Sequence, residues 1–196
     1  MLLLDGKKAS TDIKNKLKIE VEKLKEQNIT PGLGIILVGD RKDSQTYVRM
    51  KKNACQEVGI NNYDTLLPEN VDEVTIIKHI EDMNNDNNIH GILIQLPLPP
   101  HINEAKILSK VKLSKDVDGF HPENIGKLAL KRLENICVPC TPAGCLEILK
   151  FYDFNVSGKN VVVVGRSNIV GMPLSLLLLH NNATVTICHS KTQNLK

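Results

Sequence analysis

The chain has 196 residues, of which 41% are hydrophobic and 24% charged, the composition of an ordinary globular protein. A net charge of +3 and an aromatic content of 3% argue against a nucleic-acid-binding protein, so no nucleic-acid partner is expected. The sequence contains no run of about 18 apolar residues and opens without a signal-peptide pattern, so we expect a cytoplasmic protein without membrane association. Its five cysteines are irregularly spaced and predict no disulfide framework.

Helical and strand patterns alternate along the first half of the chain. The expected elements are a helix over 13–24, a strand over 33–38, a helix capped by Asp43 or Ser44 and ending at Gly59, a strand over 62–67, a helix over 74–81 and a strand over 91–96. Apolar strands between helices indicate a mostly parallel sheet that is covered on both faces. The first domain is therefore predicted to be an α/β domain over residues 1–120.

The second half has a weak pattern over 105–133 and a strong one at its end. We expect a connecting helix over about 142–154, with Thr141 as its N-cap, then a strand over 159–164, a helix to about 181 and a strand over 183–188. This strand–helix–strand order is typical of a Rossmann-type fold. A complete fold of that type has two such halves, so residues 121–196 are predicted to form an incomplete dinucleotide-binding domain.

A glycine-containing turn joins the strand over 159–164 to the helix that follows. It resembles the dinucleotide fingerprint G-x-G-x-x-G, with Gly165 as the first glycine, Ser167 in place of the second and Gly171 one position late. Backbone N–H groups at such a helix start suit a pyrophosphate. A turn that needs glycine only for its backbone angles remains the alternative.

The end of the last strand favours NADP over NAD. NAD-binding sites usually place an acidic residue there for the ribose hydroxyls, whereas this strand ends in Cys188, His189, Ser190 and Lys191. Arg166 adds a cation inside the glycine turn. Guanidinium and hydroxyl groups bind a 2′-phosphate that a carboxylate would repel, so the predicted cofactor is NADP.

Ser44, Tyr47 and Lys51 share one face of the helix over 44–58. A phenol one turn from an ammonium group is a candidate acid–base pair. The alternative is a surface lysine whose stem covers a tyrosine ring. Gln95 ends an apolar strand, where polar groups often line a ligand crevice, and Asp118 precedes a glycine and could face a ligand. The alternatives are a hydrogen-bonded amide at a strand end for Gln95 and a simple turn for Asp118. Cys137 and Cys140 have the spacing of zinc ligands, but no second pair is suitably placed, so no metal is expected.

Five segments together resemble the bifunctional methylenetetrahydrofolate dehydrogenase/cyclohydrolase family. They are residues 44–51, 91–99, 115–121, 139–142 and 164–171, in that order along the chain. The resemblance implies that Lys51 is the catalytic lysine, that Tyr47 and Gln95 act with it, and that Ser44 supports this motif. It also implies that Asp118 binds the pterin ring of the folate. The residues that resemble NADP contacts are Gly165, Arg166, Ser167 and Ser190.

The activity implied by the resemblance has two steps. NADP oxidises 5,10-methylenetetrahydrofolate to methenyltetrahydrofolate, and water then opens that product to 10-formyltetrahydrofolate. Positioning supplies most of the first step, whereas the hydrolysis needs proton transfer, for which Lys51 is the candidate. The implied partners are tetrahydrofolate derivatives, the implied assembly is a homodimer, and the implied setting is one-carbon metabolism and purine biosynthesis.

The resemblance has one departure, because family chains continue past this end with a glycine- and proline-rich segment and a final helix. We therefore expect a C-terminally truncated member with little dehydrogenase activity. One alternative is a catalytically impaired remnant that binds folate or nucleotide. Another is a different NADP-dependent dehydrogenase, which the combination of Tyr47, Lys51 and Gln95 counts against.

Overall fold

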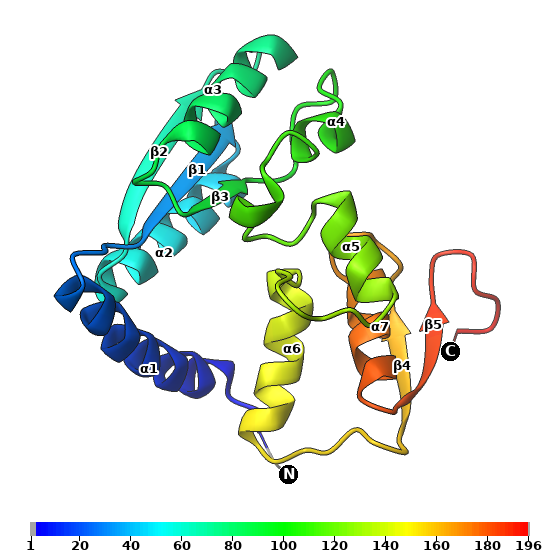
Figure 1. Ribbon diagram of the computed structural model, residues 1–196. Coiled ribbons are helices and arrows are strands. Elements are labelled where there is room, and N and C mark those ends of the chain that lie inside the picture. The colour runs from blue at the N-terminus through cyan, green and yellow to red at the C-terminus, as the bar shows by residue number, and fades with distance from the viewer. Residues whose placement is uncertain (1–2, 196) are drawn as a thin grey trace. The chain divides into compact units, whose positions relative to one another are not determined.

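The structure, a computed structural model, describes residues 3–195 and divides into two compact units. Residues 10–117 form one unit, called here the three-stranded unit, and the described residues 3–9 and 118–195 form the other, the two-stranded unit. The elements in Figure 1 are α1 (Gly6–Glu26), β1 (Gly32–Val38), α2 (Lys42–Val58), β2 (Asn61–Leu67), α3 (Glu73–Asn85), β3 (Gly91–Ile94), α4 (Glu104–Leu108), the 3₁₀ helix η1 (Leu113–Lys115), α5 (Pro122–Ala129), α6 (Cys140–Phe151), β4 (Asn160–Val164), α7 (Gly171–His180) and β5 (Thr184–Cys188).

The three-stranded unit is a parallel sheet in the order β2-β1-β3. Successive side chains of β1 point to opposite faces: Ile36 packs in the cluster that contains α3, and Ile35 in the cluster with Val48 of α2. Both isoleucines are almost completely buried. The predicted parallel sheet with helices on both faces is thereby confirmed for this unit, and its central strand explains the apolar run in the sequence.

The ends of two elements near the site differ from the predictions, and the structure adds a cap for a third element. The predicted caps Asp43 and Ser44 are wrong, because α2 already begins at Lys42 and both residues lie in its first turn. β3 ends at Ile94, so Gln95 follows the strand and is not part of it. The N-cap of α3 is Asp72, whose side chain accepts a hydrogen bond from the Thr75 amide at 2.7 Å.

The two-stranded unit pairs β4 with β5 in parallel, with Val164 opposite Cys188. Helix α7 connects these strands, as predicted. Helix α6 begins at Cys140, so the expected N-cap Thr141 is wrong: Thr141 lies inside the first turn, and Pro139 takes the cap position without a side-chain bond. The α/β fold class is confirmed in both units.

The stretch with the weak sequence pattern contains the short elements α4, η1 and α5. Helix α4 has five residues and η1 has three, too few for an apolar period to show. Helix α5 starts with Pro122 after His121, whose side chain accepts from the Glu123 amide at 3.2 Å. Across residues 3–195, no helix has both the length and the apolar character that a membrane span requires.

Candidate active site

Helix α2 presents Tyr47 and Lys51 from the three-stranded unit. The helix is held against the sheet by its buried face, which includes Ser44 and Val48, and it ends at Gly59 in the left-handed conformation with φ 86°. Ser44 is only 3% exposed, and its amide donates to the Asp43 carboxylate at 2.8 Å. Ser44 therefore lies on the buried face of α2, and this position fits a supporting role better than direct contact with a ligand.

Lys51 and Gln95, which are 44 residues apart in the sequence, meet in the structure. The Lys51 Nζ donates to the Gln95 Oε1 at 3.1 Å. The side-chain Nε2 of Gln95 donates to the carbonyl of Leu96 at 2.8 Å, and the backbone amide of Gln95 donates to the carbonyl of Ile36 in β1 at 2.9 Å. Because lysine can only donate, the carbonyl end of the Gln95 amide must face it, and the Leu96 carbonyl holds the amide in that orientation.

Tyr47 is 60% exposed and Met50 61%, so α2 offers an aromatic and an apolar surface next to Lys51. Among residues 3–195, no hydrogen bond joins the Tyr47 hydroxyl to the Lys51 ammonium group. The predicted proton coupling between them is therefore not a direct contact here. An exposed phenol ring is suited to stacking on an aromatic ring of a ligand.

Three ionisable groups on α2 have shifted pKa values, and the hydrogen bond from Lys14 lowers that of the Glu57 carboxyl. The hydrogen bonds from Arg41, at 2.7 and 3.2 Å, lower the pKa of the Asp43 carboxyl to about 2. Burial raises the pKa of the Cys55 thiol, and the charge of Asp64 raises it further while Lys51 opposes the shift. Cys55 thus stays a neutral thiol one turn beyond Lys51 and is not a candidate nucleophile.

The segment before Asp118 is tied to the end of α3. The Lys115 Nζ donates to the carbonyls of Met83 at 3.0 Å and Asp86 at 2.7 Å, and thus satisfies carbonyls at the end of the helix. Asp116 forms a parallel bridge with Ile92 of β3. These contacts fix the last residues of the three-stranded unit, which ends at Val117.

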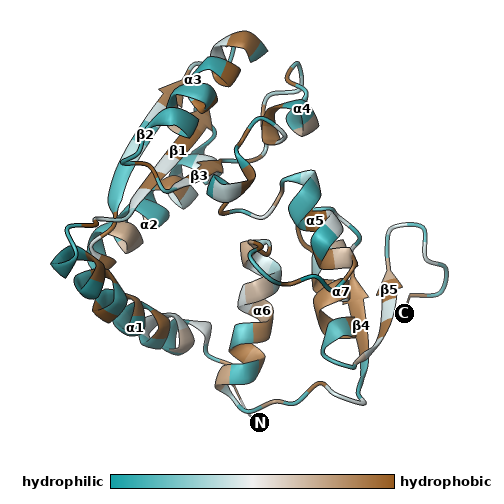
Figure 2. Ribbon diagram, viewed as in Figure 1, coloured by the Kyte–Doolittle hydropathy of each residue, from teal (hydrophilic) through white to brown (hydrophobic). Residues whose placement is uncertain are grey.

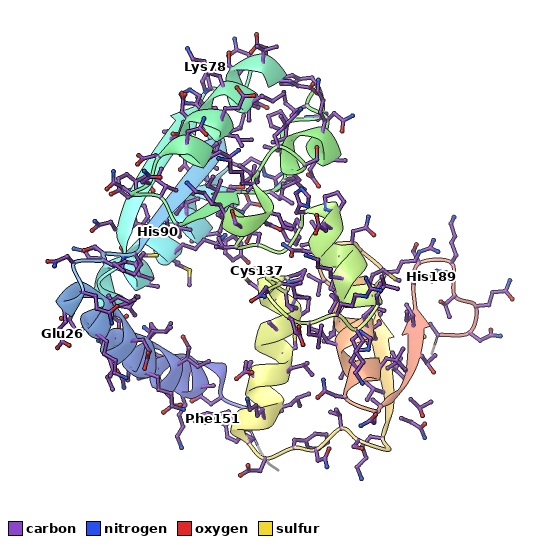
Figure 3. All side chains as sticks on the ribbon, viewed as in Figure 1. Glu26, Lys78, His90, Cys137, Phe151 and His189 are labelled. Carbon is purple, nitrogen blue, oxygen red and sulfur yellow. The ribbon has the colours of Figure 1, made fainter. Side chains whose placement is uncertain are left out.

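Asp118 belongs to the two-stranded unit and is 9% exposed. The next residue, Gly119, has φ 72°, and a β-carbon on it would lie 2.5 Å from the Cys137 carbonyl oxygen and 2.8 Å from the Pro139 nitrogen. Glycine is therefore required here for both conformation and space. The turn that carries Asp118 packs against the segment leading into α6, whose start lies near the labelled Cys137 in Figure 3.

The glycine turn after β4 has the close backbone approach that a dinucleotide fingerprint needs. Gly165 has φ 137°, and its amide donates to the Cys188 carbonyl at 2.7 Å. A β-carbon on Gly171 would lie 2.4 Å from the Gly165 carbonyl oxygen. Gly171 thus does the work of the third glycine although it stands one position late, because the helix start and the turn touch there.

Ser167 lies in the turn before α7, three residues ahead of the N-cap residue Val170. Its hydroxyl oxygen accepts from the amides of Val170 at 3.1 Å and Gly171 at 3.3 Å. In the sequence Ser167 is only a substitute for a glycine, whereas in the structure its hydroxyl satisfies two amides at the start of α7. The serine preference for N-caps did not mark this role, because the N-cap position belongs to Val170.

The turn after β5 lies beside the glycine turn, because Val164 and Cys188 are paired at the ends of adjacent strands. The turn is closed by hydrogen bonds between His189, labelled in Figure 3, and Thr192: the His189 amide donates to the Thr192 hydroxyl at 2.8 Å, and the Thr192 amide to the His189 carbonyl at 2.8 Å. Arg166 and Ser190 are both exposed. The structure therefore brings together the two segments predicted to bind the cofactor.

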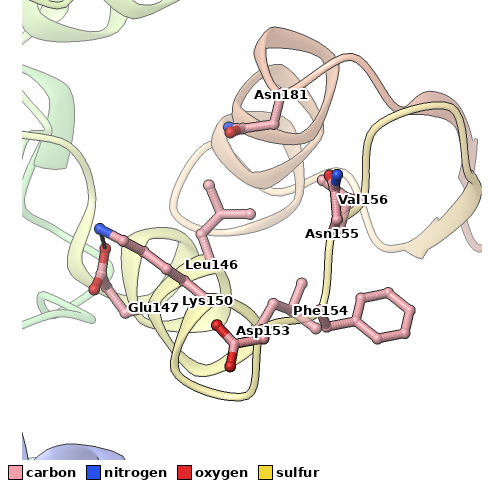
Figure 4. Close-up of a pocket in the computed structure, with 9 residues that line it drawn as sticks. Leu146, Glu147, Lys150, Asp153, Phe154, Asn155, Val156 and Asn181 are labelled. Carbon is pink, nitrogen blue, oxygen red and sulfur yellow. Dashed lines mark ion pairs between the residues drawn. The ribbon is translucent and has the colours of Figure 1, made fainter.

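Among the described residues of the two-stranded unit, open cavities lie at two places. One, of about 360 Å³, runs along β4 and the glycine turn between α6 and α7, next to the apolar strand seen in Figure 2. The other, of about 580 Å³, lies at the ends of α6 and α7 and contains none of the predicted site residues (Figure 4). Only the smaller cavity is relevant to the candidate cofactor site.

Two family models cover most of the chain. The model described as tetrahydrofolate dehydrogenase/cyclohydrolase, catalytic domain, matches residues 4–118, and the model for the NAD(P)-binding domain of the same enzymes matches residues 139–196. The chain is 52% identical over 194 residues to bifunctional protein FolD 4, chloroplastic, from Arabidopsis thaliana, and 51% identical over 193 residues to bifunctional protein FolD from Acetivibrio thermocellus. The matches cover 98% of this chain, but 54% and 67% of those relatives.

Solved structures agree in fold. The bifunctional enzyme FolD from Campylobacter jejuni matches with a TM-score of 0.96 and 47% identity, over 99% of this chain and 68% of that one. The methylenetetrahydrofolate dehydrogenase–cyclohydrolase from Trypanosoma brucei, solved with NADP and an inhibitor, matches with a TM-score of 0.94 and 39% identity, over 98% and 65% of the two chains.

Proposed function

The chain belongs to the tetrahydrofolate dehydrogenase/cyclohydrolase family, and we propose that it acts in one-carbon folate metabolism as part of a bifunctional enzyme. Its two reactions are the NADP-dependent oxidation of 5,10-methylenetetrahydrofolate and the hydrolysis of the methenyl product to 10-formyltetrahydrofolate. The observation that carries the proposal is the hydrogen bond from Lys51 Nζ to Gln95 Oε1, within the region matched by the catalytic-domain model.

In the hydrolysis, the oxygen of water bonds to the methenyl carbon and loses a proton, and a ring C–N bond then breaks as its nitrogen takes up a proton. Lys51 is the proposed proton-transfer group, because its side chain carries an ionisable amine that the hydrogen bond to Gln95 holds in place. Tyr47 supplies an exposed ring for the folate, and Ser44 supports the helix from below. Asp118 is the proposed partner of the pterin ring.

The residues after β4 and β5 fit the adenosine half of NADP. Gly165 and Gly171 allow close backbone approach, Ser167 lies at the helix start, and Arg166 and Ser190 supply a cation and a hydroxyl without a competing carboxylate. NADP, when bound, would supply the hydride acceptor for the oxidation. The chain's own residues hold and orient the reactants and need not attack the substrate.

We also propose that residues 1–120 form the folate-binding catalytic domain and residues 121–196 the NADP-binding domain. The family models over 4–118 and 139–196 support this division. A homodimer in the cytoplasm is the proposed assembly and location. Sedimentation equilibrium tests the first, and fractionation of cells that produce the protein tests the second.

Substitution of Lys51 tests the proposed chemistry. Loss of a positioned acid–base group costs roughly 10²–10⁴ in rate, so Lys51→Ala should reduce hydrolysis of methenyltetrahydrofolate by that factor. The matched control is Lys52→Ala, which removes the neighbouring lysine that pairs with Asp64 and should leave the rate within about twofold.

The absorbance of the methenyl group reports this reaction directly. Hydrolysis by Lys51→Ala at the parent's rate would contradict the assignment of Lys51. A parent chain that binds methenyltetrahydrofolate without hydrolysing it would instead support the alternative of a folate-binding remnant.

A further inference from the structure

The segment that follows Gln95, residues 96–103, is called here the proline loop. It contains Pro97, Pro99 and Pro100 and forms neither helix nor strand between β3 and α4. Each proline removes a backbone donor, so the loop has few hydrogen bonds of its own. Its side chains Leu98 and Ile102 are 8% and 7% exposed and belong to the core cluster of the three-stranded unit.

The start of the proline loop orients the side chain of Gln95. The Leu96 carbonyl accepts from Gln95 Nε2 at 2.8 Å, which leaves Gln95 Oε1 to accept from Lys51 at 3.1 Å. A displacement of this carbonyl would release the Gln95 amide to rotate. The geometry of the Lys51–Gln95 pair therefore depends on where the loop lies.

The far end of the proline loop is anchored on α3 by a carboxylate. Glu73 Oε1 accepts from the backbone amide of Asn103 at 2.7 Å, and Glu73 Oε2 accepts from Lys106 Nζ at 2.5 Å. The hydrogen bonds from Lys106 and from the Asn103 amide lower the pKa of the Glu73 carboxyl, so it is ionised at neutral pH. Charge-assisted bonds of this kind are among the stronger ones in proteins.

A second anchor lies beside the first. The Nε2 of His101 forms a hydrogen bond with the Val71 carbonyl at 2.9 Å, two residues before Glu73. The same short stretch before and at the start of α3 thus contacts the proline loop at two points. The two bonds fix the end of the loop to an element whose residues Ile76 and Ile80 are completely buried.

Glu73 is not needed to begin its own helix. Asp72 is the N-cap of α3 and satisfies the Thr75 amide. Likewise, Asn103 caps α4 with its own side chain, which accepts from the Lys106 amide at 3.1 Å. The Glu73 carboxylate is therefore directed at the loop and is not occupied by helix capping.

We propose that Glu73 is a positioning residue for the hydrolysis: it holds the proline loop so that the Leu96 carbonyl keeps the Gln95 amide facing Lys51. His101 is the second anchor of the same loop. This inference rests on the proposed function for its effect on catalysis, but its structural part concerns only the orientation of Gln95.

Nuclear magnetic resonance of the Gln95 side-chain amide tests the structural part without any turnover. The two amide protons of Gln95, assigned by their loss in Gln95→Glu, should change their chemical shifts in Glu73→Ala and His101→Ala. They should stay in place in the matched control Lys106→Met, which removes only the ion pair with Glu73. Glu73→Gln keeps an acceptor for the Asn103 amide and should resemble the parent.

Kinetics test the catalytic part. Glu73→Ala should lower kcat for methenyltetrahydrofolate hydrolysis by about tenfold, less than the full effect of a misplaced reacting group, and change KM by less than about twofold. Glu73→Gln should restore kcat to within about twofold of the parent. In a Gln95→Ala background the same Glu73→Ala change should cost less than about twofold, because residues that act through one another are not additive.

Unchanged Gln95 resonances in folded Glu73→Ala, or in His101→Ala if the first variant does not fold, would overturn the proposal. A full tenfold loss from Glu73→Ala in the Gln95→Ala background would overturn the route through Gln95. If the parent does not hydrolyse the substrate while the resonances shift as expected, the proposed function fails and the anchoring role of Glu73 stands.

Discussion

The two units contain parallel strands of similar apolar composition that differ in how far they are buried. In β1 six of seven residues are buried, because α2 and α3 cover opposite faces of the sheet. In β4 a run of four valines has only Val163 buried, while Val162 is 60% and Val164 71% exposed. The same apolar pattern therefore contributes core stability in one unit and an open surface in the other.

The candidate sites differ in the same way. Lys51 and Gln95 come from distant parts of the chain and depend on the packing of α2 and β3 around β1. The glycine turn is more local: Gly165, Ser167 and Gly171 lie within one connection and contact one another, and the turn is joined to β5 through the Gly165 amide and the Cys188 carbonyl. A site made by packing is expected to be sensitive to core mutations, and a site made by a turn to mutations within the turn itself.

The largest expected effect is on the free energy of unfolding, and it should distinguish β1 from β4. Ile36→Ala in β1 should lower the free energy of unfolding by roughly 2–5 kcal/mol, because it removes a completely buried side chain. Val162→Ala in β4 should change it by less than about 0.5 kcal/mol. Urea unfolding followed by circular dichroism measures both, and equal losses would remove the contrast drawn above.

Arg166 tests whether the glycine turn selects the cofactor. A charged hydrogen bond contributes roughly 1.5–3 kcal/mol, so Arg166→Ala should weaken NADP binding by about 10- to 150-fold and leave NAD binding nearly unchanged. Isothermal titration with each cofactor gives the two dissociation constants. Parallel losses for NADP and NAD would assign Arg166 to structural support of the turn.

Gly171 tests the close approach within the same connection. Gly171→Ala places a β-carbon 2.4 Å from the Gly165 carbonyl oxygen, so the helix must move away from the turn. We expect a loss of roughly 1–3 kcal/mol in stability, as for other overpacked sites. The matched control is Gly144→Ala, which should be tolerated because a β-carbon on Gly144 would have no atom within 4 Å. Similar melting temperatures for Gly171→Ala and Gly144→Ala would contradict the argument.

The smallest expected effect is a pH dependence in the three-stranded unit. The folded-state pKa of Glu73 is lowered from 4.5, so its bonds to Asn103 and Lys106 add stability above that value. This contribution is lost as the pH falls through the lowered folded-state pKa. The stability difference between the parent and Glu73→Gln should therefore be constant from about one pH unit above 4.5 and shrink as the pH falls below 4.5. A difference that grows on acidification would have the wrong sign.

Sequence patterns were sufficient for the elements with strong periodicity and for the family. They predicted the strands around residues 33–38 and 91–96, and the strand–turn–helix at Gly165, because alternation of apolar runs and glycine turns is a local property. They missed α4 and α5 and placed the starts of α2 and α6 too late. Short helices and their first residues depend on contacts with other elements that no local window contains.

What the sequence by itself determined is the order of α and β elements, the family and the residue types available for chemistry. The tertiary structure decided which of them act together: Lys51 reaches Gln95 across 44 residues, and Glu73 reaches Asn103 across 30. It also decided that Ser44 is buried and that the Ser167 hydroxyl binds two amides at the start of α7. The physical reason is that hydrogen-bond partners and burial are set by the packing of elements far apart in the chain, whereas periodicity and turn chemistry act over a few residues.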